Sequence, residues 1–321
     1  MKKISKIYFI IFIFLFKISL CKSQVNSKID TTEITQIGGI KQLISIKGND
    51  KEKPILLFLH GGPGSSLIEV SENYTDQLKN EFVIINWDQR ETGETLKLNP
   101  TNVALTQELF KNDTYEIITF ILKRFSRDKL YLVSHSWGSV LGFDIVEKHP
   151  ELLYAYIAIS PIINQTKSSE LTMETLKNWA IKSNNKDAIN ELNLVKIPFE
   201  NQEDLFYSQK WLFIHNGVDF AKKEDFKTNY YKWMSVWFDV WKKSTESNLF
   251  KTLPKINCPI YFIEGNADKL KMHYLVKDYF KFISAPKKKF FWMRKSGHTV
   301  FNTEPEKLQK IILKKIKQKT N

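Results

Sequence analysis

The sequence predicts an α/β fold: a mostly parallel sheet with helices on both faces and an inserted block of helices. Three observations predict it. Short apolar runs of strand length alternate with helical stretches, which is typical of a parallel sheet covered on both faces. The alternation stops between about residues 160 and 253, where no clear strand is present. Hydrophobic residues make up 42% of the 321 residues, enough for a sizeable core.

The first 23 residues predict an export signal. The basic stretch MKKISK precedes the apolar run IYFIIFIFLF, which Lys17 interrupts before it reaches membrane-spanning length. A transmembrane helix needs about 20 apolar residues, so the segment is typical of a signal peptide cleaved after Cys21 or Ser23. We therefore expect an exported protein, periplasmic or secreted. The alternative is a lipid anchor on Cys21 at the cell envelope, and we expect no other contact with a membrane. Cys258 is the only other cysteine, so we expect no internal disulfide.

Residues 24–161 are predicted to form the first part of the sheet domain. A short hairpin at 38–48 precedes four apolar runs bounded by turn residues, which are typical of strands buried on both faces. Helical stretches separate several of these runs. The four strands are predicted in KPILLFLHGG, EFVIINWDQR, KLYLVSHSWG and LYAYIAISP.

Residues 162–253 are predicted to form a helical cap inserted between two strands of that domain. The segment carries five of the eight tryptophans. Residues 254–321 then return to the sheet domain, with two more strands and a final helix that has a basic end. These strands are predicted in CPIYFIEGNAD and KKFFWMRKSGH.

The formal net charge of +13 invites a nucleic-acid interpretation, which the composition does not favour. Only four of the 48 basic residues are arginines, the side chain suited to bidentate contacts with phosphate and guanine. The lysines are scattered along the chain. The sequence also lacks a metal-ligand cluster, a phosphate-binding loop and a dinucleotide fingerprint. We therefore expect no nucleic acid, no metal and no cofactor, and a small molecule or short peptide as the substrate.

Ser136, in SHSWG, is the candidate nucleophile. It lies between a predicted strand and a predicted helix, with Gly138 two residues further on. A sharp strand-to-helix turn lifts a serine out of the sheet and points the helix N-terminus at developing negative charge. The usual pattern is G-x-S-x-G, and Ser134 replaces its first glycine. A serine that merely caps the helix is the competing interpretation.

A serine hydroxyl needs a base and an orienting acid to become a nucleophile. Among six histidines, His298 follows the last predicted strand, in a loop of the kind where the catalytic residues of parallel sheets collect. His135 is adjacent to Ser136 and is expected to face elsewhere. By the same logic Asp268, on the loop after the preceding strand, is the candidate acid. Glu264 lies inside that strand and has less freedom to reach the histidine.

The HGGPG turn at residues 60–64 ends an earlier strand. Its glycines tolerate unusual backbone angles, and its proline fixes one torsion. Such a turn directs backbone N–H groups at a substrate with no side chain in the way. We expect the N–H groups of Gly62 and Trp137 to bind the oxyanion.

HGGPG, WDQRETG, SHSWGS, GNAD and SGH together resemble the motif set of the proline iminopeptidase-like α/β-hydrolases, which have HGGPG, DQRG.G and GGSWGS in the same order. The order Ser136, Asp268, His298 is also that of the α/β-hydrolases. The resemblance covers residues 35–161 and 254–320. It implies the α/β-hydrolase fold with a helical cap, and a serine hydrolase that removes an N-terminal residue, often proline, from short peptides.

Acidic residues decide whether the substrate's free amine is recognised. The residue after Arg90 is Glu91, whereas the family has glycine at that position. Glu91 is expected near the entrance of the pocket. The resemblance implies cap glutamates that hold the amine, one of them in a W..WE helix. Here that helix has Phe238 at the glutamate position and Asp239 beside it, so Asp239 is the candidate. A one-residue step turns a side chain by about 100° around a helix, which also allows Asp239 to face solvent. Glu170 and Glu174 are further candidates.

Trp233, Trp237 and Trp241 repeat every four residues and share one helix face. They pack the cap on the sheet domain, or Trp237 lines a pocket for a flat apolar group such as a proline ring. The leading hypothesis is an aminopeptidase. One alternative is a carboxylesterase or lactonase with the same triad, and the other is a non-catalytic binding protein of this fold. The intact triad argues against the last.

Overall fold

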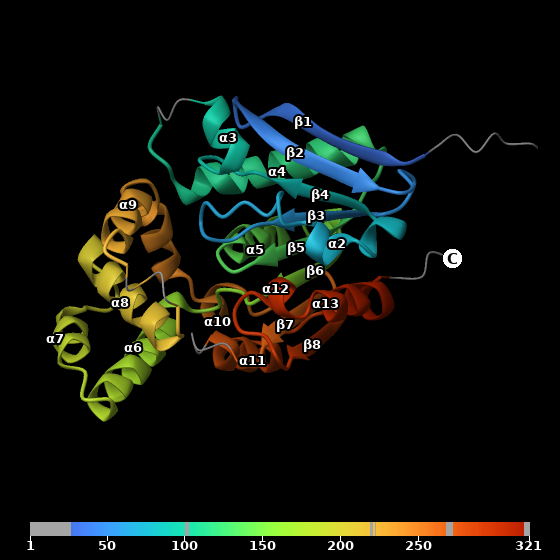
Figure 1. Cartoon of the computed structure of the whole chain (residues 1–321). Helices are drawn as coiled ribbons and strands as arrows, with labels where there is room; N and C mark the ends of the chain where they lie inside the picture. The colour runs from blue at the N-terminus through green and yellow to red at the C-terminus, as the bar shows by residue number, and fades with distance from the viewer. Residues whose placement is uncertain (1–26, 100–102, 219–220, 222, 268–271, 318–321) are drawn as a thin grey trace, which may run out of the picture.

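The computed structural model describes residues 27–99, 103–218, 221, 223–267 and 272–317. The predicted export signal, with Cys21, and the predicted acid Asp268 lie outside these residues. Within the described ranges, no helix is both long and apolar enough to cross a membrane. Figure 1 shows a sheet between layers of helices and, beside it, a lobe made of helices.

One sheet of eight strands forms the centre of the molecule, in the order β1-β2-β4-β3-β5-β6-β7-β8. The β1–β2 and β2–β4 pairs are antiparallel and the others are parallel. The α/β class predicted from the sequence is thereby confirmed. The strands are β1 Ile29–Ile37, β2 Ile40–Gly48, β3 Ile55–Leu59, β4 Val83–Trp87, β5 Leu130–His135, β6 Leu153–Ile159, β7 Ile260–Gly265 and β8 Lys288–Met293.

The hairpin that begins the sheet is longer than the sequence predicted. Its pairing starts with Ile29 opposite Gly48, whereas the prediction covered only 38–48. Gly38 and Gly39 turn the chain with φ angles of +57° and +77°, which glycine adopts without a steric penalty. The prediction missed most of β1 because this edge strand alternates exposed and half-buried residues and has no apolar run.

Helices cover both faces of the sheet. Side chains of α4, α5 and α11 join the core on one face, and side chains of α2, α12 and α13 join the core on the other. The helices are α2 Glu72–Thr75, α3 Gly93–Leu98, α4 Gln107–Arg124, α5 Gly138–Lys148, α11 Met272–Phe282, α12 Val300–Thr303 and α13 Pro305–Ile311, with short helical turns at Leu78–Asn80, Pro150–Leu152 and Ile312–Ile316.

The chain between β6 and β7 forms the helical lobe seen in Figure 1. Asn164, Asn185 and Asn201 each precede a helix and accept a hydrogen bond from a backbone N–H of its first turn. Such caps satisfy donors that the helix itself leaves unpaired, and so fix where each helix begins. The helices are α6 Gln165–Lys182, α7 Lys186–Leu194, α8 Gln202–His215 and α9 Phe226–Lys243, followed by η4 Ser244–Glu246 and α10 Leu249–Thr252.

A buried ion pair ties the chain after β4 to helix α4. Arg90 Nε donates to Asp113 Oδ2 at 2.5 Å, and Nη2 donates to Oδ1 at 3.0 Å. Gln42 donates to the same carboxylate at 2.8 Å and accepts from Trp87 Nε1 at 2.7 Å. Arg90 also donates to the carbonyl of Gly38. Because the two charges meet each other and further polar partners, the network is buried without an isolated charge.

His60, directly after β3, is a buried histidine that stays neutral. Its Nδ1 lies 3.0 Å from the carbonyl oxygen of Gly61, and its Nε2 accepts from the Gln89 N–H at 3.2 Å. Burial lowers the pKa of His60 to about 4, since a charged ring shielded from water is unfavourable. The folded chain therefore resists a proton that the unfolded chain accepts.

Acidification is expected to destabilise the fold through His60. An unfolded histidine has a pKa of about 6.5, so the stability that neutral His60 contributes is complete above that pH. It is lost as the pH falls from about 6.5 towards about 4, by about 3 kcal/mol in the free energy of unfolding. Urea unfolding at about pH 7 and about pH 4 measures the loss.

The variant His60→Asn should lose less stability over this range than the wild type. His149→Asn is the control, because the His149 side chain is partly exposed, and it should keep the wild-type dependence. An identical pH dependence in His60→Asn and wild type would show that His60 is not the group responsible.

Candidate active site

Ser136 occupies the turn between strand β5 and helix α5. Its φ is +51°, in the left-handed region, and its N–H donates to the Ile159 carbonyl on β6 at 3.0 Å. This conformation is uncommon for a residue with a Cβ and often marks a functional site. A Cβ at Gly138 would lie 2.5 Å from the carbonyl oxygen of His60. Glycine at that position therefore lets α5 begin against the end of β3.

The serine at the first glycine position of the motif belongs to the core. Ser134 lies within β5, and its buried hydroxyl contacts the hydroxyl of Tyr156 on β6. The Tyr156 ring fills the space beside Gly142 of α5, where a Cβ would lie 2.4 Å from the tyrosine oxygen. The hydrogen bond between Ser134 and Tyr156 thus accommodates a serine where the G-x-S-x-G motif has its first glycine.

His298 lies against the hydroxyl of Ser136. Its Nε2 is 2.9 Å from Ser136 Oγ, although the two residues are 162 positions apart in the chain. Both follow strands that run in the same direction, so the carboxyl ends of these strands share one edge of the sheet. At this distance the imidazole can take the serine proton as the oxygen attacks an electrophile.

Two side chains hold the main chain of His298. His135 Nε2 lies 3.0 Å from the His298 carbonyl oxygen, and the Ser160 hydroxyl donates to the same oxygen at 3.0 Å. Ser160 follows β6 and has a φ of +45°, a second left-handed serine at this edge of the sheet. The His135 and His298 rings are 5.0 Å apart between centroids. Sequence reasoning missed this arrangement because no local pattern links His135 to a partner 163 positions away.

The chain after β7 is held against the loop that carries His298. The Ala267 N–H donates to the Ser296 carbonyl at 3.0 Å. A Cβ at Gly265 would lie 2.0 Å from the Gly297 carbonyl oxygen, so the two segments touch along their backbones. Asp268, the residue after Ala267, lies outside the described residues. Glu264, the alternative acid, is fully buried within β7.

The HGGPG loop lies directly beside Ser136. A Cβ at Gly61 would lie 3.0 Å from the Ser136 Cβ and 2.8 Å from the His135 carbonyl oxygen, so this approach requires glycine. Gly62 has a φ of +111°. In the described part of the chain, the N–H groups of Gly62 and Trp137 donate to no other residue.

The chain after β4 turns sharply at Glu91. Asp88 anchors this turn, because its carboxylate accepts from the Ser66 hydroxyl and, at 3.0 Å, from the Glu94 N–H. Burial raises the pKa of Asp88. Glu91 is half-buried and has a φ of +53°. Glycine adopts such an angle without a steric penalty, which explains why the family has glycine at this position. The turn lies at the same edge of the sheet as Ser136, since β4 runs parallel to β3 and β3 runs parallel to β5.

Helix α9 rests on the HGGPG loop through two tryptophans. Trp233 Nε1 donates to the Pro63 carbonyl at 3.1 Å. Trp237 is buried against Gly64, where a Cβ would lie 2.7 Å from the indole nitrogen. The Trp237 ring also packs on Phe110 of α4, with 5.6 Å between the centroids. The helical lobe therefore covers the loop that flanks Ser136, and Trp237 contributes to that packing.

The acidic candidates of the helical lobe are exposed. Asp239 is exposed on α9, whereas Phe238, at the family's glutamate position, is buried. Glu174 is exposed on α6. Among the described residues, no group of three His, Cys, Asp or Glu side chains is placed to hold a metal ion.

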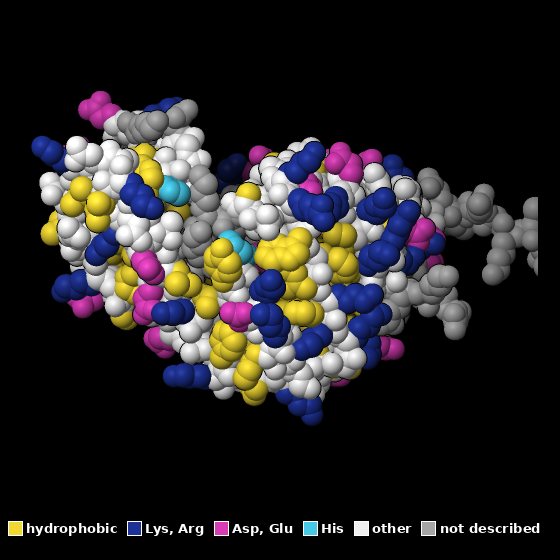
Figure 2. All heavy atoms as spheres, turned by 90° about the horizontal axis from the view of Figure 1, so that it is seen from below, with side chains coloured by type: hydrophobic (Ala, Val, Ile, Leu, Met, Phe, Trp, Pro, Cys, Tyr) yellow, Lys and Arg dark blue, Asp and Glu magenta, His cyan; other side chains and the backbone are white. Residues whose placement is uncertain are grey.

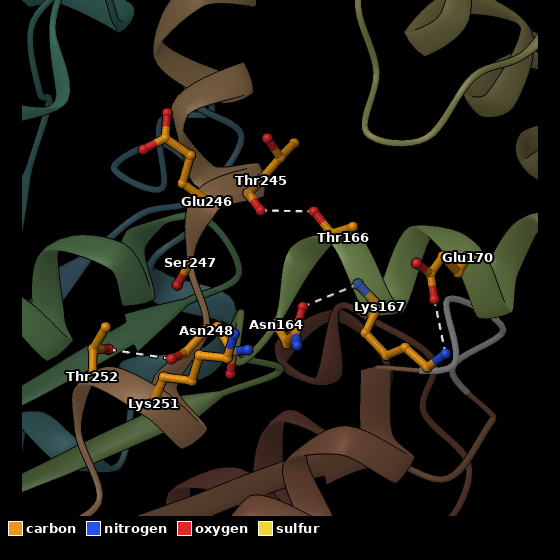
Figure 3. Close-up of a pocket in the computed structure, with 10 residues that line it drawn as sticks. All are labelled: Asn164, Thr166, Lys167, Glu170, Thr245, Glu246, Ser247, Asn248, Lys251 and Thr252. Carbon is orange, nitrogen blue, oxygen red and sulfur yellow. Dashed lines mark hydrogen bonds and ion pairs between the residues drawn. The ribbon is translucent and has the colours of Figure 1, made fainter.

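A hollow of about 380 Å³, lined by polar and charged residues, lies between the start of α6 and the segment from η4 to α10 (Figure 3). Glu170 lines it and pairs with Lys167 at 2.8 Å, and the Thr166 hydroxyl donates to the Thr245 carbonyl at 2.7 Å. The predicted catalytic and oxyanion residues are not among those that line it. Glu170 therefore belongs to a feature other than the surroundings of Ser136.

Known proteins resemble this chain over most or part of its length. The family described as alpha/beta hydrolase fold matches residues 54–305. A probable aminopeptidase of Bacillus subtilis (strain 168) is 28% identical over 290 residues, which cover 84% of this chain and 91% of that protein. A proline iminopeptidase of Lactobacillus helveticus is 30% identical over 130 residues, which cover 39% of this chain and 41% of that protein.

Solved structures share the fold. A proline iminopeptidase-related protein from Thermus thermophilus superposes with a TM-score of 0.57 at 18% identity, over 88% of this chain and 96% of that one. A thermophilic esterase from Thermogutta terrifontis gives 0.53 at 15% identity, over 89% and 96%. At such low identity these likenesses concern the fold alone. The range that matches the family, residues 54–305, includes the turn at Ser136 and the loop at His298. The chain therefore belongs to the alpha/beta hydrolase fold family and is a hydrolase with relatives named as an aminopeptidase and as proline iminopeptidases.

Proposed function

We propose that the protein is a serine hydrolase in which Ser136 is the nucleophile, His298 the base and Asp268 the orienting acid. The observation that carries the proposal is the 2.9 Å contact between His298 Nε2 and the hydroxyl of Ser136. A serine that only capped a helix would not need a histidine at that distance. The left-handed turn supports the same role, because it presents the hydroxyl beyond the end of the strand.

In this mechanism Ser136 Oγ attacks the carbonyl carbon of the substrate while its proton passes to Nε2 of His298. The N–H groups of Gly62 and Trp137 receive the negative charge that develops on the carbonyl oxygen. His298 then gives the proton to the leaving amine or alcohol, which leaves an acyl group on Ser136. A water molecule deprotonated by His298 releases the acyl group and restores the serine.

We infer that the substrate is a short peptide from which an N-terminal residue, of the proline type, is released. The names of the relatives support this, since they include a probable aminopeptidase and a proline iminopeptidase. The second candidate is a small ester. It is favoured by the burial of Phe238 where the family has a glutamate, and by the exposure of Asp239 beside it.

Replacing the members of the triad tests the mechanism. Ser136→Ala and His298→Ala should each lower kcat by about 10⁴-fold or more, because without nucleophile or base only oxyanion binding remains. A fluorophosphonate probe, followed by peptide mass spectrometry, should label Ser136 in the wild type. Thermal unfolding should give Ser136→Ala a midpoint close to that of the wild type. Labelling at Ser134 or Ser139 would contradict the assignment.

Asp268→Asn and Glu264→Gln form a matched pair that tests the acid. The first should be severe, since an amide stabilises the wrong tautomer of the histidine. The second should mainly affect stability, because Glu264 is buried within β7. A silent Asp268→Asn together with an inactive, folded Glu264→Gln would transfer the role to Glu264.

His135 and Ser160 should act as positioning residues for His298. Losing one of the two hydrogen bonds to the His298 carbonyl should slow labelling of Ser136 by about 3–10-fold, the net value of one hydrogen bond. His135→Phe and Ser160→Ala remove a donor, whereas His135→Gln keeps an N–H and should retain most of the rate. Ser160→Gly is the control for backbone strain, because it relaxes the left-handed φ yet still lacks the hydroxyl. Wild-type labelling in both donor-free variants would refute the role.

Glu91 and Asp239 decide between amine and ester substrates. An ammonium enclosed under the helical lobe needs a carboxylate, since burying it unpaired is costly. Glu91→Gln should therefore raise KM for an aminoacyl arylamide by about tenfold, in line with a charged hydrogen bond, and leave acetyl esters nearly unaffected. Asp239→Asn should have the smaller effect because Asp239 is exposed.

Glu94→Gln, three residues from Glu91 and paired with exposed Lys97, is the matched control and should leave both substrates unchanged. If neither Glu91→Gln nor Asp239→Asn separates the two substrates, and esters turn over faster in every variant, the enzyme is an esterase.

A further inference from the structure

The net charge is concentrated in the C-terminal part of the chain. Residues 251–321 contain 17 Lys and Arg against 5 Asp and Glu, whereas residues 27–250 contain 26 against 30. Lysines are spread along the whole chain, as the sequence indicated, but the acidic residues that balance them elsewhere are scarce here. The two parts of the chain therefore carry net charges of opposite sign.

This basic part of the chain builds one edge of the sheet. In the described structure β8 pairs only with β7, while α11 covers one face of these strands and α13 the other. Figure 2 shows the molecule from below, the side on which α11 and β8 lie in Figure 1. Lys and Arg side chains surround exposed hydrophobic side chains there, and acidic side chains are few.

Six exposed basic residues from α11 to just beyond β8 define what we call the basic edge. Among the described residues, only one of the six has an acidic side chain within ion-pair distance, and that acid, Asp278, is itself exposed. Most of this positive charge is therefore left for an external partner. The six are Lys277, Lys281, Lys287, Lys289, Arg294 and Lys295.

Aromatic side chains lie among these charges. Tyr274 and Phe282 on α11 are 55% and 51% exposed, and Trp292 on β8 is partly exposed. Tyr274, Lys277 and Lys281 follow helical spacing, so they share the solvent face of α11. Aromatic rings next to lysines are typical of protein surfaces that lie in the interface of a lipid bilayer.

We propose that the basic edge docks the protein onto an anionic lipid surface. Negatively charged headgroups attract neighbouring Lys and Arg side chains cumulatively, and amphipathic rings settle at headgroup depth. Lysine, a compact point charge, suits such a diffuse layer, whereas nucleic-acid recognition favours the bidentate arginine. Arg294 is the single arginine in residues 251–321. The surface shares no residue with the proposed triad, so docking concentrates the enzyme at the lipid without changing its chemistry.

The test compares full-length chains with two matched sets of substitutions. Each set removes four positive charges. The first set changes lysines of the basic edge, and the second, the control set, changes exposed lysines elsewhere in the fold. Sedimentation measures binding to vesicles of phosphatidylcholine alone and to vesicles in which phosphatidylglycerol replaces a third of that lipid. All chains carry the same N-terminal segment, so its contribution cancels. The basic-edge set is K277Q, K281Q, K287Q and K289Q, and the control set is K41Q, K51Q, K123Q and K182Q.

The wild type and the control set should bind the phosphatidylglycerol vesicles, and the basic-edge set should bind about tenfold less or weaker still. Added salt should weaken wild-type binding. Thermal midpoint and turnover of a soluble substrate should be the same in both sets. Equal vesicle binding by the two sets would overturn the proposal, as would binding to double-stranded DNA without binding to the vesicles. If the basic-edge set self-associates and the wild type does not bind lipid, the lysines instead keep the edge strand β8 from pairing with another chain.

Discussion

The left-handed backbone at Ser136 is the constraint on which the site depends. A residue with a Cβ holds a φ of +51° only where its surroundings over-determine it. Gly61 and Gly138 supply those surroundings, because a Cβ at either position would come within 3.0 Å of the neighbouring chain. The HGGPG loop, the start of α5 and the raised serine are therefore one packing requirement and not three separate motifs. This is why the flexible and rigid residues of that loop occur together at the end of a buried strand.

The parallel sheet then brings the remaining groups to the same edge. The ends of β5 and β6 provide His135 and Ser160, which hold the main-chain carbonyl of His298, while the His298 ring reaches Ser136. A base on a loop that moved freely would spend little time in a reactive orientation. Two donors from rigid strands restrict that motion. The sheet thus positions both the proposed nucleophile, Ser136, and the residues that support its proposed base, His298.

Features with a local signature could be predicted from the sequence. The buried strands appear as apolar runs, and Ser136 and His298 each follow one of them, so their meeting was foreseeable. Most of β1 was not, because an edge strand shows alternation where a buried strand shows a run. The hydrogen bonds from His135 and Ser160 to the His298 carbonyl could not be predicted either, because they join segments more than a hundred residues apart. The polarised charge has no local signature for another reason: it arises from the scarcity of acidic residues in residues 251–321 and not from a run of lysines.

The anchoring of the loop after β4 bears on where specificity resides. A carboxylate holds an ammonium well only when its own position is fixed, since ordering a mobile side chain costs part of the binding free energy. Arg90, the residue before Glu91, is bound through two nitrogens to buried Asp113. Asp88, two residues before Arg90, accepts a hydrogen bond from the Glu94 N–H at the start of α3. Asp239, by contrast, is exposed on the helical lobe. The contacts of Arg90 and Asp88 fix the backbone on both sides of Glu91, so Glu91 is the better supported of the two residues proposed to bind the amine.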